Sequence, residues 1–283
     1  MTSWYKKGKE LLEEIQTTVL SDDEIAIWFL GQCGFAVKRQ TTVFLIDPVL
    51  NDLKDEEGNT KRLYEPPFDP SEIQCNCIFC THKHSDHMAK ETILPILANN
   101  HTAKIIVPEA CEQILSDWDI PEERIIAADE RREYSCEGVR FFTISTAHPT
   151  HQRDGNRKIR NLAYYFSLGE IRILHLGDTY LTEQLHADIK NLPRVDILMT
   201  PINGRDYYRE QSNIVGNMEP EEAAKLAADI GTDLTIPMHY DMMKGNTSDP
   251  LRFVRAYCDI TDGGRKWMLP ALGERVIYKM PAV

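Results

Sequence analysis

The sequence contains no long hydrophobic run. None of its apolar segments approaches the roughly 20 residues that a membrane-spanning helix needs. The first ten residues, MTSWYKKGKE, carry basic side chains without a following apolar stretch, which argues against a secretory signal peptide. We therefore expect a cytoplasmic protein with no membrane partner.

Basic residues are fewer than acidic ones. The 283-residue chain has 32 Lys and Arg against 44 Asp and Glu, and its formal net charge is −12 at pH 7. This excess of negative charge disfavours nucleic acid as a stable partner, because the phosphate backbone would be repelled. It leaves room for a small anionic substrate, for example a phosphorylated one, held in a locally basic pocket.

The chain also lacks the features of a disulfide framework and of a multidomain array. Seven cysteines are an odd number, which suits reduced thiols, and the run 75–80 is interpreted as a buried strand rather than a thiolate metal site. There is no internal linker and no short-period repeat. A hydrophobic content of 42% supports one sizeable core, so residues 23–283 are predicted to form a single domain.

Residues 1–22 are predicted to be a helical extension packed on that domain. Leu11, Leu12, Ile15 and Val19 recur at helical spacing among Lys and Glu residues. Such a stripe is typical of a surface helix with one apolar face, and we expect this face to rest on the domain.

The domain is predicted to belong to the α/β (α+β) class. Residues 24–30, 35–37 and 43–46 are interpreted as an antiparallel meander of three strands. After it, apolar strand segments alternate with helical patterns, and the order of strands followed by helices occurs twice. This repetition indicates two similar halves packed together, with a cleft where two sheet edges meet.

The stretch Thr81–His87 reads THKHSDH and directly follows the short apolar segment 78–80. Imidazole and carboxylate are the side chains that bind borderline divalent metals. His82 and His84 are two residues apart and face the same way if the backbone stays extended, whereas Asp86 and His87 face elsewhere. One short loop could therefore supply two ligands to each of two neighbouring ions.

Three more candidate ligands each follow a separate predicted strand. They are His148 after residues 139–146, Asp178 after residues 171–176 and His239 after residues 234–238. His151 is a rival of His148, which we prefer because it follows its strand at once. The glycine before Asp178 would let the backbone approach closely while the carboxylate turns toward a metal.

Two residues are candidates for supporting these ligands. Asp47 leaves the third strand of the meander, where a carboxylate can hold a metal ligand by a hydrogen bond, although it could equally start a turn before Pro48. His175 is expected to be buried in its strand close to the site.

Three long loops, 51–72, 149–160 and 201–217, are expected to shape the binding site. Two of them are rich in basic and aromatic residues, which predicts an anion clamp beside the metals; the alternative is a solvated loop. The candidate substrate-binding residues are Arg153, Arg157, Arg160, Arg205 and Tyr207.

Four segments together resemble the metallo-β-lactamase superfamily and, within it, the L-ascorbate-6-phosphate lactonase family. They are Thr81–His87, Arg160–Phe166, His175–Asp178 and Ile236–Asp241, and they occur in the same order. The resemblance implies a four-layer αββα sandwich of two mixed β-sheets flanked by helices. It also suggests a homo-oligomer.

The same resemblance implies a division of the ligands between two divalent ions, with Asp178 bridging the pair. The first ion would be bound by His82, His84 and His148, and the second by Asp86, His87 and His239. The histidine-rich ligand set suits zinc, whereas the lactonase resemblance implies manganese.

We therefore expect a hydrolase in which a hydroxide shared by two metal ions attacks the substrate. Asp178 and Asp86 are the predicted catalytic carboxylates: Asp178 would bridge the metals, and either Asp86 or a metal-bound water would move a proton to the leaving group. The leading hypothesis is the opening of a phosphorylated sugar lactone. The alternatives are a phosphodiesterase of the same fold acting on a small phosphodiester or nucleotide, and a metal-binding protein without catalysis.

Overall fold

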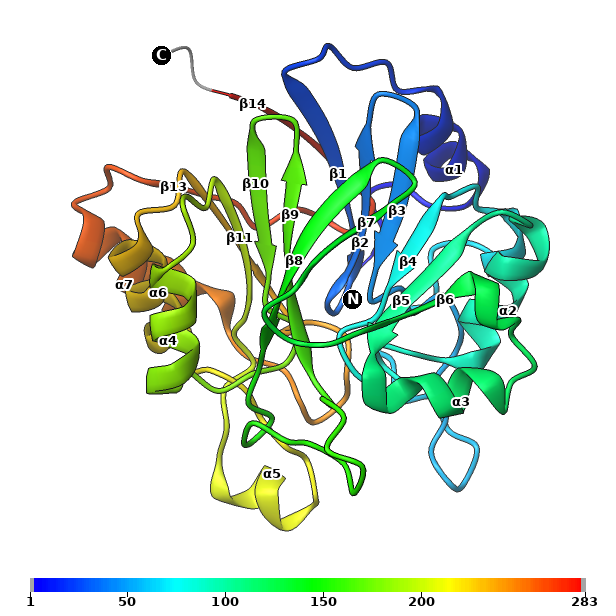
Figure 1. Cartoon of the computed structure of the whole chain (residues 1–283). Coiled ribbons are helices and arrows are strands. Elements are labelled where there is room, and N and C mark those ends of the chain that lie inside the picture. The colour runs from blue at the N-terminus through cyan, green and yellow to red at the C-terminus, as the bar shows by residue number, and fades with distance from the viewer. Residues whose placement is uncertain (1–2, 281–283) are drawn as a thin grey trace.

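Two seven-stranded mixed β-sheets pack face to face in the computed structural model, which describes residues 3–280 (Figure 1). Helices cover the outer face of each sheet, so the layers run αββα. This architecture confirms the predicted fold class. Among residues 3–280, no helix is both long enough and apolar enough to cross a bilayer.

The first sheet has the strand order β14-β1-β2-β3-β4-β5-β6. Strands β1 to β3 form the antiparallel meander that the sequence predicts, and β3 to β6 run parallel. Its strands are β1 (Glu24–Gly31), β2 (Gly34–Arg39), β3 (Thr42–Ile46), β4 (Cys77–Phe79), β5 (Lys104–Pro108), β6 (Ile125–Ala128) and β14 (Arg275–Lys279).

The second sheet has the strand order β13-β12-β11-β10-β9-β8-β7. It too is antiparallel at first, from β7 to β10, and parallel afterwards, from β10 to β13. The two sheets are thus similar halves, as the repeated order of elements predicts. Its strands are β7 (Glu133–Cys136), β8 (Val139–Ser145), β9 (Leu162–Leu168), β10 (Ile171–His175), β11 (Ile197–Pro201), β12 (Leu234–Met238) and β13 (Lys266–Trp267).

The helices divide between the two sheets. In Figure 1, α1, α2 and α3 lie on the side of the first sheet, and α4, α6 and α7 on the side of the second, with α5 at the end of the molecule. Their bounds are α1 (Gly8–Thr17), α2 (Lys90–Asn99), α3 (Glu112–Ser116), α4 (Glu183–Lys190), α5 (Tyr207–Gln211), α6 (Pro220–Ile230) and α7 (Pro250–Thr261).

Aromatic rings fill the space between the sheets. The ring centroid of Phe79 in β4 lies 4.9 Å from that of Phe166 and 5.0 Å from that of Phe141, both in the second sheet and both nearly perpendicular to it. Edge-to-face pairs of this kind stabilise a core beyond the area that they bury. These contacts hold the two sheets at a fixed distance from each other.

The strand β3 shows why the sequence reads as unbroken hydrophobic runs. Phe44 and Ile46 point into the space between the sheets, whereas Val43 and Leu45 pack toward the helices outside the first sheet. A strand covered on both faces must be apolar at successive positions. The same reason explains the three buried residues of β4, which deliver the histidine-rich loop.

The helix α1 packs on the first sheet through Leu11, Leu12 and Ile15, all of which are buried. The prediction that Val19 also packs on the domain is wrong. Val19 is 90% exposed, because α1 ends at Thr17. The division into residues 1–22 and 23–283 stays a prediction.

Lys38 of β2 explains where α1 ends. Its buried ammonium donates hydrogen bonds to the carbonyl oxygens of Ile15, at 2.9 Å, and Gln16, at 2.6 Å. Carbonyl groups in the last turn of a helix have no partner within the helix. A cation there is also attracted by the partial negative charge of the helix C-terminus. The chain leaves the helix at this point and carries Val19 to the surface.

Residues 201–217, predicted to be a loop, contain the short helix α5. Asp206 caps it, since its carboxylate accepts the backbone N–H groups of Tyr208 at 2.9 Å and Arg209 at 3.0 Å. An aspartate followed by Tyr-Tyr-Arg-Glu is a readable helix start. The surrounding Gly and Asn residues obscured it.

Candidate metal centre

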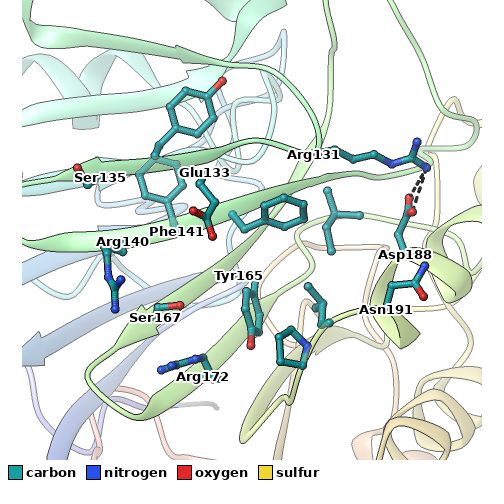
Figure 2. Close-up of a pocket in the computed structure, with 15 residues that line it drawn as sticks. Arg131, Glu133, Ser135, Arg140, Phe141, Tyr165, Ser167, Arg172, Asp188 and Asn191 are labelled. Atoms are coloured by element: carbon teal, nitrogen blue, oxygen red, sulfur yellow. Dashed lines mark hydrogen bonds and ion pairs between the residues drawn. The ribbon is translucent and has the colours of Figure 1, made fainter.

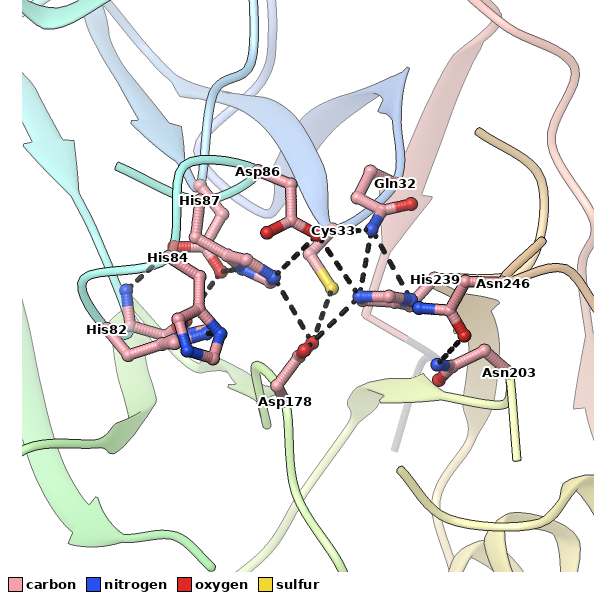
Figure 3. Close-up of polar contacts among 12 residues, drawn as sticks. Gln32, Cys33, His82, His84, Asp86, His87, Asp178, Asn203, His239 and Asn246 are labelled. Carbon is pink, nitrogen blue, oxygen red and sulfur yellow. Dashed lines mark hydrogen bonds and ion pairs between the residues drawn. The ribbon is translucent and has the colours of Figure 1, made fainter. Parts of the chain in front are cut away.

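The seven predicted metal ligands lie together at one end of the two sheets. Figure 3 labels six of them, all except His148. Thr81–His87 follows β4, and the three other segments follow β8, β10 and β12. The two sheets thus present their ligand-bearing strand ends to each other. Sequence reasoning placed each ligand after a strand, and packing of the sheets brings them to one site.

The first group consists of His82, His84 and His148, which offer nitrogen atoms within 4.8 Å of one another. The Nε2 atom of His82 lies 2.8 Å from Nδ1 of His84. The Nδ1 atom of His148 is buried and has no hydrogen-bond partner. Three imidazoles with nitrogen atoms this close to one another fit a divalent metal such as zinc.

The second group contains His87, His239 and Asp178, with Asp86 beside them. Nε2 of His87 lies 3.3 Å from Oδ1 of Asp178 and has no hydrogen-bond partner, although it is fully buried. Nε2 of His239 lies 3.2 Å from Oδ2 of Asp178 and 3.6 Å from Oδ2 of Asp86. These donors also fit a divalent metal.

Asp178 lies between the two groups. Both of its carboxylate oxygens face the second group, Oδ1 toward His87 and Oδ2 toward His239, and Oδ2 also lies 3.6 Å from Nε2 of His148 in the first group. A carboxylate with an oxygen toward each group is what a bridging ligand requires. The ligand roles themselves remain predictions.

Asp47 holds both groups in place from beneath. Its fully buried carboxylate accepts three hydrogen bonds of 2.7 Å, from the backbone N–H of Thr81, from the hydroxyl of Thr81 and from Nδ1–H of His87. The Thr81 hydroxyl lies 3.1 Å from Nδ1 of His82. Because Nδ1–H of His87 is bound to Asp47, Nε2 is the ring nitrogen that faces the site, and it offers a lone pair to a metal when the imidazole is neutral.

His175 and Gly177 position the strand end that carries Asp178. The fully buried His175 donates from Nε2 to the carbonyl oxygen of Cys33, at 3.0 Å, and accepts the N–H of Gly177 on Nδ1, at 3.2 Å. Gly177 has φ +59°, and a Cβ atom there would lie 2.7 Å from the side chain of Thr81. Only glycine lets the two strand ends approach this closely.

The turn between β1 and β2 contributes two residues that the sequence reading missed. Gln32 donates from Nε2 to Oδ2 of Asp86, at 2.8 Å, and its Nε2 lies 2.8 Å from Nε2 of His239. The thiol of Cys33 donates to Oδ1 of Asp178, at 3.7 Å. Both side chains are fully buried. In the sequence, the sign of a special role is that these two polar residues stand between two glycines in an otherwise apolar segment.

The two groups differ in charge. Burial lowers the pKa of His82 well below its ordinary value and that of His148 to about 4, so the first group is neutral. Burial also opposes the cationic forms of His87 and His239. There, however, Asp178 and the nearby carboxylates prevail and raise both pKa values, that of His239 to about 9. The second group therefore attracts positive charge.

A family model described as beta-lactamase superfamily domain matches residues 42–240. The chain belongs to the metallo-β-lactamase superfamily. It is accordingly a metal-dependent hydrolase of this fold. Those residues contain all seven candidate ligands.

Individual relatives in the superfamily are distant. A UPF0173 protein of Pyrococcus abyssi is 28% identical over 224 residues, which cover 79% of this chain and 86% of that protein. A probable L-ascorbate-6-phosphate lactonase, UlaG, of Salmonella heidelberg is 22% identical over 279 residues, which cover 86% of this chain and 77% of that protein. The structure of a metallo hydrolase from Ignicoccus hospitalis shares the fold, with a TM-score of 0.68, 18% identity and coverage of 91% and 100%.

A cavity of about 160 Å³ opens beside the first group of histidines. Lys83 and Arg160 line it together with His84 and Gln152. The guanidinium of Arg160 donates to Oε1 of Gln152, at 3.1 Å, which is a neutral partner. Arg160 is thus the predicted substrate-binding residue that the structure places at the superfamily's metal site, and Lys83 is an addition from within the motif itself.

The other predicted substrate-binding residues have different surroundings. Arg153 forms an ion pair with Glu130, and Arg157 is exposed on the same loop. Arg205 binds Glu222 through two hydrogen bonds of 2.8 and 3.0 Å. None of these, nor Tyr207 (67% exposed on α5), is among the described residues that line the cavity beside the histidines.

The structure separates the two rival histidines. His151 has both ring nitrogens next to hydroxyl groups, with Nδ1 2.9 Å from Oγ of Ser145 and Nε2 2.9 Å from Oγ1 of Thr182. His148 instead faces His84 and Asp178. This geometry favours His148 as the ligand.

A much larger cavity, of about 1050 Å³, lies elsewhere, on the outer face of the second sheet (Figure 2). Tyr165 and Phe142 form part of its wall, and the ion pair between Arg131 and Asp188 lies at its rim. None of the seven candidate ligands lines it. The smaller cavity, by contrast, is lined by three of the candidate ligands, His82, His84 and His148.

Replacing Asp47 by asparagine tests whether it orients the ligands. An amide cannot accept hydrogen bonds on both of its polar atoms, so His87 and Thr81 lose part of their support. We expect metal affinity to fall by about 10- to 100-fold, the usual effect of such a change, in competition titrations with a chelating dye. The exposed Asp22→Asn is the control, and equal affinities in all three proteins would contradict this role.

The stability of the metal-free protein should depend on His239. Its pKa is raised from 6.5 to about 9, so its attraction to the carboxylates stabilises the fold fully below pH 6.5 and is lost as pH rises through about 9. We expect the urea midpoint of the chelator-treated protein to fall over this range relative to that of His239→Gln. A constant difference between the two midpoints would contradict the assignment.

Proposed function

We propose that the protein opens a small, anionic carboxylic ester, with a phosphorylated sugar lactone as the leading candidate. The observation that carries this proposal is the pair Lys83 and Arg160 in the cavity beside the first histidines, which Asp154 also lines. Cations without a carboxylate partner can bind a phosphate. Neighbouring basic residues such as Arg153 and Lys158 are instead neutralised by Glu130 and Glu112.

A relative supports the choice of a lactone. The Salmonella protein named as an L-ascorbate-6-phosphate lactonase matches 86% of this chain, although at only 22% identity. A cavity of about 160 Å³ at the metal site suits a compact substrate better than a polymer. The substrate would place its phosphate toward Arg160 and its ring carbonyl toward the histidines.

The proposed centre holds two divalent ions, zinc or manganese. His82, His84 and His148 would hold the first, and His87 and His239 the second, together with Asp86. Two such ions lower the pKa of a shared water to about 7 and so supply hydroxide at neutral pH.

The carboxylates would divide the remaining work. The pKa of Asp178 is lowered strongly: burial opposes ionisation, but His239 and His87 outweigh it, so the residue stays an anion between the two groups. Asp86 has a lowered pKa for the same reason, and its side chain is 18% exposed. Because a lowered pKa makes Asp86 a weak base, either Asp86 or a water at the metal centre would carry the proton to the leaving alkoxide.

Two other functions remain as outcomes of the test. The same residues could act on a small phosphodiester, since two metal ions can also hold the oxygens of a phosphoryl group. A metal-binding protein without catalysis would retain the ligands and lack turnover. The resemblance to the lactonase family is also the basis for proposing that the protein forms a homo-oligomer.

A substrate panel distinguishes these functions. Zinc- and manganese-loaded protein is offered phosphorylated and plain sugar lactones together with bis-p-nitrophenyl phosphate. We expect the phosphorylated lactone to be opened fastest and its kcat/KM to fall about tenfold or more in Arg160→Gln, because a charged hydrogen bond is lost. Cleavage of the phosphodiester alone would overturn the lactonase proposal.

The variant Asp178→Asn separates a catalyst from a structural metal protein. A catalyst should lose at least about 100-fold in turnover, more than a merely orienting residue contributes, while its fold survives. The exposed Asp229→Asn is the control. Loss of thermal stability in Asp178→Asn, with no activity in the parent protein on any substrate, would favour a structural metal site.

A further inference from the structure

The turn between β1 and β2 brings a thiol to the second group of ligands (Figure 3). Cys33 is wholly buried. Its Sγ atom and one donor atom each from His87, Asp178 and His239 all lie within 4.8 Å of one another. Four converging donors of the types S, N, N and O are a ligand set that zinc accepts.

The distances between these donors are close to those between ligands of one zinc ion. Bonds of about 2.0–2.3 Å to zinc separate the ligand atoms of a tetrahedron by about 3.3–3.6 Å. Oδ1 of Asp178 lies 3.7 Å from Sγ of Cys33 and 3.3 Å from Nε2 of His87. His239 is nearest to the other carboxylate oxygen, with Nε2 3.2 Å from Oδ2.

A second observation points to a cation at this place. Nε2 of His87 is buried and lacks a hydrogen-bond partner, while the other ring nitrogen is engaged by Asp47. A buried polar atom without a partner is costly, and a metal ion would satisfy it. It lies against the same oxygen of Asp178 that receives the thiol of Cys33.

The surrounding residues hold Cys33 in this position. Its carbonyl oxygen accepts a hydrogen bond from His175, and the backbone N–H of Gln32 donates to Asp241, at 3.2 Å. Gln32 itself has φ 58°, a conformation that is kept only when the neighbouring structure enforces it. The thiol is therefore presented by a rigid turn.

Asp86 occupies a different place from the one that a simple ligand list suggests. Its Oδ2 atom accepts a hydrogen bond of 2.8 Å from Nε2 of Gln32. It does not join the four mutually close donors, whereas Cys33 does. The same oxygen of Asp86 lies 3.6 Å from Nε2 of His239 and 3.7 Å from Nε2 of His87, so Asp86 and Cys33 both border these two imidazoles.

We propose that the thiolate of Cys33 is a ligand of the second metal ion and selects zinc over manganese. The inference rests on the metal centre of the proposed function, and it concerns the metal rather than the substrate. The thiol proton leaves to solvent as the sulfur–zinc bond forms, so no oxidant or reductant is involved. Thiolate favours zinc strongly, whereas manganese prefers oxygen ligands.

The test is spectroscopic. Metal-free protein is loaded with two equivalents of Co²⁺, and Cys33→Ser is compared with the parent and with Cys258→Ser, whose cysteine lies in α7. We expect a sulfur-to-cobalt charge-transfer band in the near ultraviolet in the parent and in Cys258→Ser, and none in Cys33→Ser. In equilibrium dialysis with both metals, the zinc-to-manganese ratio should fall at least about tenfold in Cys33→Ser.

Measurements on the parent protein keep the inference falsifiable even if Cys33→Ser does not fold. X-ray absorption of the zinc-loaded protein must show a sulfur atom at about 2.3 Å from zinc. Absence of that scatterer, or of the band in cobalt-loaded parent protein, overturns the inference. Hydrolysis without a sulfur signal refutes the Cys33 ligand alone, whereas a sulfur signal without any hydrolysis refutes the proposed function alone.

Discussion

The centre depends on one buried carboxylate, that of Asp47. Its three hydrogen bonds of 2.7 Å tie the end of β3 to the loop that follows β4 and to His87. Through the hydroxyl of Thr81 the same carboxylate also reaches His82, so ligands of both groups share one anchor. A buried charge is costly unless hydrogen bonds satisfy it, and here they do. This anchor holds the loop against the end of β3 and orients His87 so that Nε2 faces the site.

The site also concentrates backbone conformations that side chains rarely adopt. Asp47, Gln32 and His239 all have positive φ, of 42°, 58° and 59°. Each lies where a strand ends and its side chain must turn toward the other sheet. Such conformations cost on the order of 1–3 kcal/mol each and persist only where packing enforces them. The aromatic layer between the sheets supplies that packing, so the fold's core supports the geometry of its site.

Much of this arrangement was predictable because it is local in sequence. Ligands such as Asp178 follow short apolar strands, and a period of two or a run of apolar residues reveals a strand directly. The contribution of Gln32 and Cys33 was not predictable, since it depends on which turn faces the ligands after the sheets pack. The same limit applies to Arg205: a basic loop suggested an anion clamp, but its guanidinium binds Glu222, a partner 17 residues away on α6. Charge in a loop predicts binding only when its partners are known.

The central claim is that two separate groups of donors, linked by Asp178, hold two metal ions. Elemental analysis tests it most directly: the protein is stripped with a chelator, equilibrated with zinc and freed of unbound metal by gel filtration, and zinc is measured per chain. The account predicts two zinc ions per chain in the parent protein. One ion per chain, or none, would contradict it.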